Sequence, residues 1–204
     1  MIRWLRSHRA LAGFGLSYYL ALLGVGAATG NGQTPIYAVF MAALFVLVIV
    51  VDRRVEFSRG VLWGLAGWGL LHMCGGLLPA GDGRVLYEVW LLPVLRFDHV
   101  VHAFGFGFAG LACWEAAGRA APEAFTGRAA LAVVVLGGTG LGGLNEMVEF
   151  LISQLVADTN VGGFENTGWD LVANLAGCVL AGLWAARTGR PAVDRADGPS
   201  ARRP

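Results

Sequence analysis

The run of residues 35–51, PIYAVFMAALFVLVIVV, decides the fold class because it carries no charged side chain. As a helix it would rise about 25 Å, which is close to the roughly 30 Å of hydrocarbon in a bilayer. Together with five further apolar runs it defines candidate spans at residues 11–29, 35–51, 60–79, 98–116, 128–153 and 168–186. The sequence therefore predicts an all-α polytopic membrane protein with about six transmembrane helices.

Composition agrees with a chain that lies mostly within a membrane. Of the 204 residues, 56% are hydrophobic and 14% are charged, whereas soluble domains average about 25% charged residues. We expect a single transmembrane domain over residues 1–187 and a disordered cytoplasmic tail over residues 188–204, which are rich in Pro, Gly, Asp and Arg. The formal net charge of +1 argues against a nucleic-acid partner, which would require a basic patch.

The positions of the arginines predict the orientation of the chain. All 15 basic residues are Arg, and 13 of them lie on alternate connections between the spans. Basic connections resist translocation and stay in the cytoplasm. We therefore expect both termini to be cytoplasmic, which requires an even number of spans and agrees with the count of six.

The same topology predicts an acidic outer side. Eight acidic residues and only two arginines fall there, and three of the four histidines lie on that side too. A bound cation would help to balance this excess of carboxylates. The outer segment 85–95 is apolar but too short to span, so we expect it to be interfacial or re-entrant.

The fourth span opens with Asp98 and His102, which are four residues apart and therefore share a helix face. His99 lies about 100° to one side of that face. An aspartate at the start of a helix is also typical of a residue that caps the N-terminus, and this alternative stays open for Asp98.

The fifth span ends with Glu146 and Glu149, which share a face three residues apart. Glu146 lies about 10 Å from the predicted helix end, and an acidic side chain near the centre of a bilayer costs about 2.5–3.5 kcal/mol on insertion scales. We therefore expect Glu146 to be protonated, paired with a histidine of another span, or bound to a metal. Gly138 and Gly142, which precede it, favour either close helix packing or a broken helix that lines a cavity.

The sixth span begins near Asp170, followed one turn later by Asn174. Thr167 and Asp170 together resemble a capping box, so Asp170 is either a cap or a site residue. An amide within a span usually forms hydrogen bonds between helices, which favours a site role for Asn174. Asp158 and Glu165 flank the loop before this span; they are either solvated or fold over the outer mouth.

The ordered set of Asp98-x3-His102, Glu146-x2-Glu149 and Asp170-x3-Asn174-x2-Gly177 resembles the YjdF-like and VanZ-like bacterial membrane proteins. The resemblance covers about residues 97–182. It implies a multi-pass protein of the bacterial plasma (inner) membrane. It departs from the VanZ-like pattern at His99, where that pattern usually has Lys, and in lacking an Arg shortly before the last Asp. The YjdF-like branch is therefore closer, and the resemblance supplies topology more than mechanism.

Three functional classes follow from these residues, and the sequence leaves open whether the protein is an enzyme. In the first, a divalent metal, zinc or another transition metal, supports a hydrolase or transferase that acts on a lipid-linked substrate in the bilayer. The second is a proton-coupled transporter or binding protein, and the third is a noncatalytic envelope protein with a structural polar core. An oligomer is compatible with all three. The predicted site has catalytic residues Glu146 and Glu149, metal ligands Asp98, His102, Glu146 and Asp170, and secondary residues His99, His72, Asn174, Asp158 and Glu165.

Overall fold

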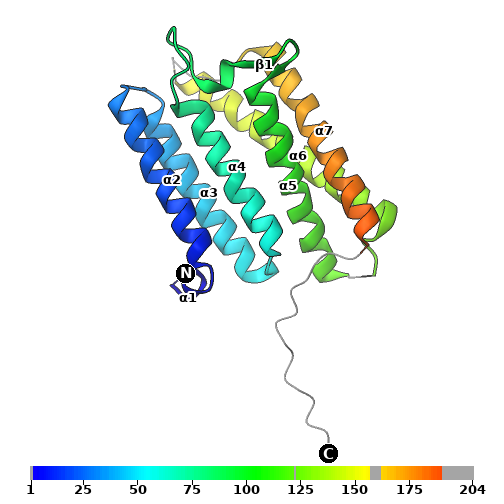
Figure 1. Ribbon diagram of the computed structural model, residues 1–204. Helices are drawn as coiled ribbons and strands as arrows, with labels where there is room; N and C mark the ends of the chain where they lie inside the picture. The colour runs from blue at the N-terminus through cyan, green and yellow to red at the C-terminus, as the bar shows by residue number, and fades with distance from the viewer. Residues whose placement is uncertain (1, 122, 157–161, 190–204) are drawn as a thin grey trace, which may run out of the picture.

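The computed structural model describes residues 2–121, 123–156 and 162–189. Its elements follow the chain in a simple order (Figure 1). The helices, 3-10 turn and strands are α1 (Ile2–Ser7), α2 (Arg9–Ala28), α3 (Thr34–Val55), α4 (Arg59–Leu77), η1 (Leu86–Glu88), β1 (Trp90–Leu92), β2 (Leu95–Arg96), α5 (Phe97–Ala120), α6 (Gly127–Leu155) and α7 (Phe164–Thr188).

Six of the helices, α2 to α7, are long and apolar enough to cross a membrane, which confirms the predicted fold class. Most of them begin or end a few residues beyond the predicted apolar runs, because a helix continues past the residues that must face hydrocarbon. The largest differences are four residues: α3 ends at Val55, α5 ends at Ala120, and α7 begins at Phe164. The predicted disordered tail lies outside the described residues from residue 190 onward.

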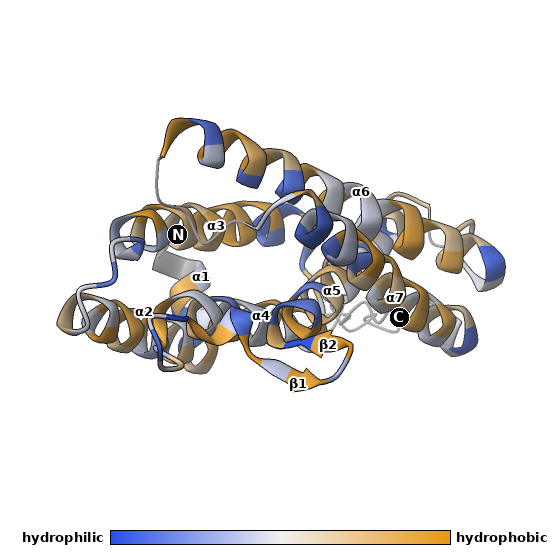
Figure 2. Ribbon diagram, turned by 90° about the horizontal axis from the view of Figure 1, so that it is seen from above, coloured by the Kyte–Doolittle hydropathy of each residue, from blue (hydrophilic) through white to orange (hydrophobic). Residues whose placement is uncertain are grey.

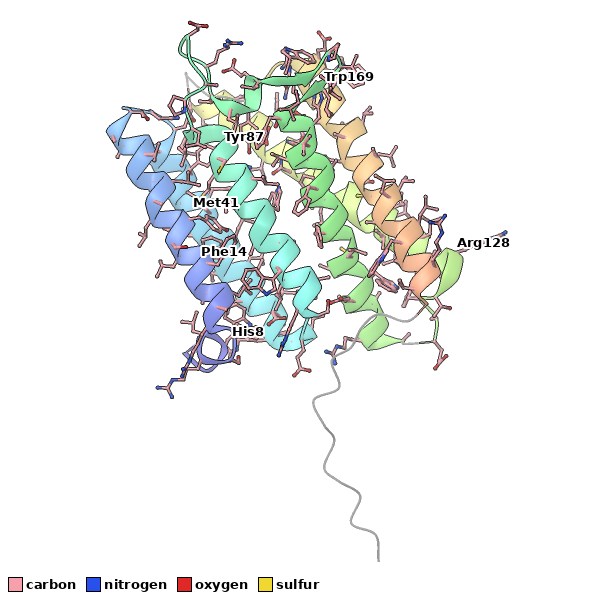
Figure 3. All side chains as sticks on the ribbon, in the orientation of Figure 1. His8, Phe14, Met41, Tyr87, Arg128 and Trp169 are labelled. Atoms are coloured by element: carbon pink, nitrogen blue, oxygen red, sulfur yellow. The ribbon has the colours of Figure 1, made fainter. Side chains whose placement is uncertain are left out.

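An even number of spans brings the start of α2 and the end of α7 to the same end of the bundle (Figure 1). At the opposite end, β1 and β2 pair as a short antiparallel hairpin that lies over the helices. We call this the hairpin end and the other the α1 end. Figure 3 shows Tyr87 and Trp169 at the hairpin end and His8 and Arg128 at the α1 end. Segment 85–95 therefore lies at this end of the bundle, along one edge of it (Figure 2), and does not re-enter it.

Glycines allow α5, α6 and α7 to pack closely. A Cβ on Gly138 of α6 would lie 2.7 Å from the carbonyl oxygen of Phe106, and a Cβ on Gly177 of α7 would lie 1.8 Å from that of Ala103. Both glycines therefore allow the backbone of their own helix to contact the backbone of α5. Helix α6 is continuous from Gly127 to Leu155, so the glycines serve helix packing and the broken-helix alternative is wrong.

Two clusters of buried side chains lie on either side of α4. One, which includes Tyr18, Met41 and Met73, joins α2, α3 and α4. The other, which includes Val61 and Trp114, joins α4 to α5, α6 and α7. Seen from the hairpin end, α3 and α6 lie on the side of the bundle opposite the hairpin (Figure 2).

Candidate functional site

The first turns of α5 direct Asp98 and His102 into the bundle. Nε2 of His102 lies 3.5 Å from Oδ1 of Asp98, as the four-residue spacing predicts. The backbone N–H of Arg96 donates to Nδ1 of His99 at 3.2 Å. His99, and not Asp98, therefore contacts the backbone at the start of this helix.

Helix α7 carries polar side chains at successive turns on the face that packs against α5. Because α7 begins at Phe164, Thr167 and Asp170 lie inside the helix and the capping-box alternative is wrong. Asp170 and Asn174 are both 0% exposed. Asn166, one turn before Asp170, donates Nδ2 to a carboxylate oxygen of Asp170 and, at 3.4 Å, to Oδ2 of Asp98.

His102 is the centre of the cluster because both of its ring nitrogens face polar groups. While Nε2 faces Asp98, Nδ1 lies 3.2 Å from Oδ1 of Asn174 and 3.6 Å from Oε1 of Glu146. One imidazole of α5 thus lies within reach of α6 and α7.

The two glutamates of α6 differ in their surroundings. Glu149 accepts a hydrogen bond from Nδ2 of Asn145 at 2.7 Å. Glu146 is 6% exposed. Neither of its carboxylate oxygens has a hydrogen bond of standard geometry among the described residues, although the side chains of Asn145 and Thr167 lie close to it. Oδ1 of Asp170 and Nδ2 of Asn174 are buried and unpartnered in the same way. Since buried polar groups in native proteins are nearly always hydrogen-bonded, these atoms point to a missing polar or cationic partner.

The donor atoms are close enough together for metal ligation. Asp98, His102 and Asp170 each offer a ligand atom within 4.8 Å of the others, and so do His102, Glu146 and Glu149. His102 belongs to both groups. Carboxylate oxygen with imidazole nitrogen is a donor set that suits zinc and other first-row transition metals.

A cavity of about 90 Å³ adjoins the cluster. On one side it is lined by Asp98, His102 and Glu149, and on the other by aromatic side chains that include Tyr37 and Tyr87. Because one water needs about 10–15 Å³ of such volume, the cavity has room for several. It gives the acidic cluster a connection to the surroundings of the protein.

His72 lies on the aromatic side of this cavity. The hydroxyl of Tyr87, which comes from the 3-10 turn η1, hydrogen-bonds to Nδ1 of His72. Burial raises the pKa of Tyr87 well above its usual value, so the hydroxyl stays protonated and acts as the donor. The rings of Tyr37, Phe40 and Trp68 also lie 5.2–5.8 Å from the imidazole ring.

Two predicted secondary residues stand apart from the cluster, and a third lies outside the described residues. His99 turns toward the rings of Trp90 and Trp169, on a different side of α5. Glu165 is exposed in the first turn of α7. Asp158 lies outside the described residues.

The structure also places residues at the site that the predicted set leaves out. Asn166 joins Asp98 to Asp170, and Asn145 holds Glu149. Their signal was present in the sequence, since Asn166 is four residues before Asp170 and Asn145 is four before Glu149. Tyr37 and Tyr87 carried no such signal, because only the fold brings their segments to the cavity.

A model of the family described as "Predicted membrane protein (DUF2238)" matches residues 10–191. The chain belongs to the DUF2238 family. No curated protein and no solved structure matches it. The matched range holds all six long helices of this DUF2238 member apart from Arg9, so the family covers the cluster, the cavity and the segment that supplies Tyr87.

Proposed function

We propose that the protein binds a divalent transition metal, zinc or a similar ion, at the Asp/His/Glu cluster. With it, the protein would act as a hydrolase or transferase on a lipid-linked substrate. The observation that carries the proposal is the buried carboxylate of Glu146, which lies beside His102 and has no hydrogen bond of standard geometry in the described part of the chain. An ionised carboxylate left so in a low-dielectric interior is costly, and a cation removes the cost.

Asp98, His102, Asp170 and Glu146 are the proposed ligands. Zinc lies about 2.0–2.2 Å from nitrogen and oxygen ligands. The ligand atoms of Asp98, His102 and Asp170 lie within 4.8 Å of one another, and Glu146 joins His102 and Glu149 in a second group of the same size, so side-chain rotations would be needed to bring all four ligands around one ion. Asn166 and Asn174 fix this arrangement through their hydrogen bonds to Asp170 and His102. Such outer partners orient metal ligands in many sites.

Glu149 is the proposed general base. It lines the cavity and its carboxylate is oriented by Asn145. A bound divalent metal lowers the pKa of a coordinated water. Glu149 would take the proton from a water molecule in the cavity as the water oxygen bonds to the electrophilic centre of the substrate, and would give that proton to the leaving group as the bond between that centre and the leaving group breaks.

The proposal places the cluster at the outer face of the bacterial plasma membrane. The arginine distribution supports it, because the hairpin end carries few of the basic residues. The resemblance to YjdF-like and VanZ-like proteins supports the same location. We treat residues 1–187 as one transmembrane domain, in accord with the cores that join α4 to the helices on both sides.

Proton-coupled transport or binding is the second candidate. The position of Glu149 on the wall of the cavity favours it, because the carboxylate is accessible to protons there. A purely structural polar core is less well supported. Such a core would satisfy its own hydrogen bonds, whereas Glu146 does not.

Elemental analysis of detergent-purified protein tests the proposal. We expect about one equivalent of a transition metal in the wild type and its loss in Glu146→Gln and His102→Ala. Glu115→Gln is the matched control, because Glu115 is also a buried glutamate of a span but lies at the α1 end, where it accepts from the backbone N–H of Ser58 at 2.8 Å.

A wild-type protein that holds no metal after incubation with zinc or manganese would overturn the metal proposal. If the variants also keep their fold, the proton-coupled class would then take its place. Metal retained in both variants would show that a metal is bound elsewhere in the chain.

A further inference from the structure

The cavity beside the cluster opens toward the bilayer between α3 and α6. Its apolar edge is formed by Ile36 of α3 and by Val148 and Ile152 of α6. Val148 is 42% exposed although it lines the cavity. Both helices lie on the same side of the bundle (Figure 2), and each packs chiefly on other neighbours, α3 on α2 and α6 on α5 and α7.

The helix surface around this opening is apolar and faces outward. Val39 of α3 and Met147, Phe150 and Leu151 of α6 are each more than half exposed. In a membrane these side chains contact lipid tails. The opening therefore faces acyl chains, and the wall behind it carries the polar side chains of Asp98, His102 and Glu149.

The wall opposite the carboxylates is aromatic and is held in place by two adjacent glycines of α4. A Cβ on Gly75 would lie 2.4 Å from the ring of Tyr87, and one on Gly76 would lie 1.8 Å from the hydroxyl of Tyr37. Both rings are thus seated against the α4 backbone. Phe40 completes this wall.

Charge decides which headgroup fits. The carboxylates of Asp98 and Glu149 line the cavity, and no Lys or Arg is found among its described lining residues. Aromatic faces together with nearby carboxylates attract ammonium groups, whereas an anionic headgroup would meet like charge.

We propose that the cavity binds the amine-bearing headgroup of an outer-leaflet lipid, which enters sideways between α3 and α6. The ammonium lies between the rings of Tyr37 and Phe40 and the carboxylates of Asp98 and Glu149, and the phosphate lies nearer the opening, on the acyl-chain side of the ammonium. This deepens the proposed function and rests on it only in naming the lipid as substrate. The binding itself requires no metal.

Lipid retention measured by native mass spectrometry tests the inference. The protein is purified from nanodiscs that contain equal amounts of dioleoyl-phosphatidylethanolamine and dioleoyl-phosphatidylglycerol. We expect about tenfold preferential retention of the ethanolamine lipid, as cation–π recognition at a partly desolvated site allows. Tyr37→Leu should abolish the preference and Tyr37→Phe, which keeps the ring, should preserve it.

A second pair of variants tests whether the lipid enters sideways between α3 and α6. Val148→Trp fills the opening and should reduce retention, whereas Met147→Trp, on the neighbouring lipid-facing surface, should not. Ile152→Trp replaces Val148→Trp if that variant elutes as an aggregate. Equal retention of the two lipids would overturn the headgroup class, and retention unchanged by the filled opening would overturn the sideways route.

Metal content measured in the same preparations separates this inference from the proposed function. Selective lipid retention without metal would support the headgroup site and contradict the metal proposal. Bound metal without selective lipid retention would support the metal proposal and contradict the headgroup site.

Discussion

Glu146 and Glu149 lie one turn apart on α6, yet their carboxylates differ in hydrogen bonding and burial. Glu149 accepts from Asn145, while Glu146 is buried without a hydrogen bond of standard geometry among the described residues. Burying a carboxylate whose oxygens are not fully hydrogen-bonded costs free energy even after the protein relaxes. The stability of the protein should therefore respond to substitutions at the two positions in different ways.

We predict that Glu146→Gln stabilises the chelator-treated protein by about 1–3 kcal/mol, because it replaces a buried carboxylate that lacks hydrogen bonds of standard geometry with a neutral amide of nearly the same shape. The thermal midpoint in detergent measures this. Glu149→Gln is the control and should shift the midpoint less. A lower midpoint for metal-free Glu146→Gln would contradict the expected cost of the wild-type carboxylate.

Two buried tyrosines provide a second comparison. We predict that Tyr87→Phe costs about 0.5–1.5 kcal/mol, since it removes a hydrogen bond to His72. Tyr18→Phe should be neutral or stabilising, because the hydroxyl of Tyr18 is buried and unpartnered in the described part of the chain. Burial raises the pKa of Tyr87 well above its usual value. The loss of stability caused by Tyr87→Phe should therefore be the same between pH 6 and 8. Equal effects of the two changes on the free energy of unfolding would contradict this account.

At the scale of elements, glycine determines how closely α5, α6 and α7 approach. We predict that Gly177→Ala destabilises the protein by about 1–3 kcal/mol, because the new Cβ would meet the carbonyl oxygen of Ala103 at 1.8 Å. Gly168→Ala is the matched control in α7. It meets nothing within 4 Å and should stabilise the helix by about 0.5–1 kcal/mol.

Unfolding of both variants in increasing denaturant provides the measurement. If Gly177→Ala proved as stable as Gly168→Ala, the close contact between α5 and α7 would be wrong. Metal or lipid binding should fall with Gly177→Ala too, since α5 and α7 carry His102 and Asn174 on either side of the site.

The sequence predicted the long helices well because their apolar runs exceed what any soluble element requires. It did not predict the ends of α7 or the short hairpin. The start of α7 is polar, so hydropathy could not extend the helix back to Phe164. The strands β1 and β2 hold five residues in all, too few for a period-2 pattern to be recognised.

At the scale of the whole molecule, the sequence predicted which spans carry the site but not how its wall is completed. The helical spacing of Asp98 with His102 and of Asp170 with Asn174 fixes one face of each helix, so α5, α6 and α7 were identified as the source of the cluster. Tyr37 and Tyr87 lie far from these helices in the chain. Their positions depend on α4, whose Gly75 and Gly76 accept the two rings, and no local pattern encodes that packing.

Orientation in the membrane is the whole-molecule prediction. We expect the hairpin end to face outward, because the arginines concentrate on the connections at the α1 end. Alkaline phosphatase fused after Gly83 should be active, and the same enzyme fused after Glu56 should be inactive. The reverse pattern would invert the topology and place the proposed site on the cytoplasmic side.

Close packing among α5, α6 and α7 also has a consequence for biosynthesis. A chain emerges from the ribosome in order, so Asp98, His102, Glu146 and Glu149 enter the membrane before Asp170 and Asn174 do. Until α7 inserts, His102 lacks its contact with Asn174, and Asp98 lacks Asn166. The last of the six spans to be translated is therefore the one that completes the site, and a nascent chain halted before Phe164 lacks both Asp170 and Asn174.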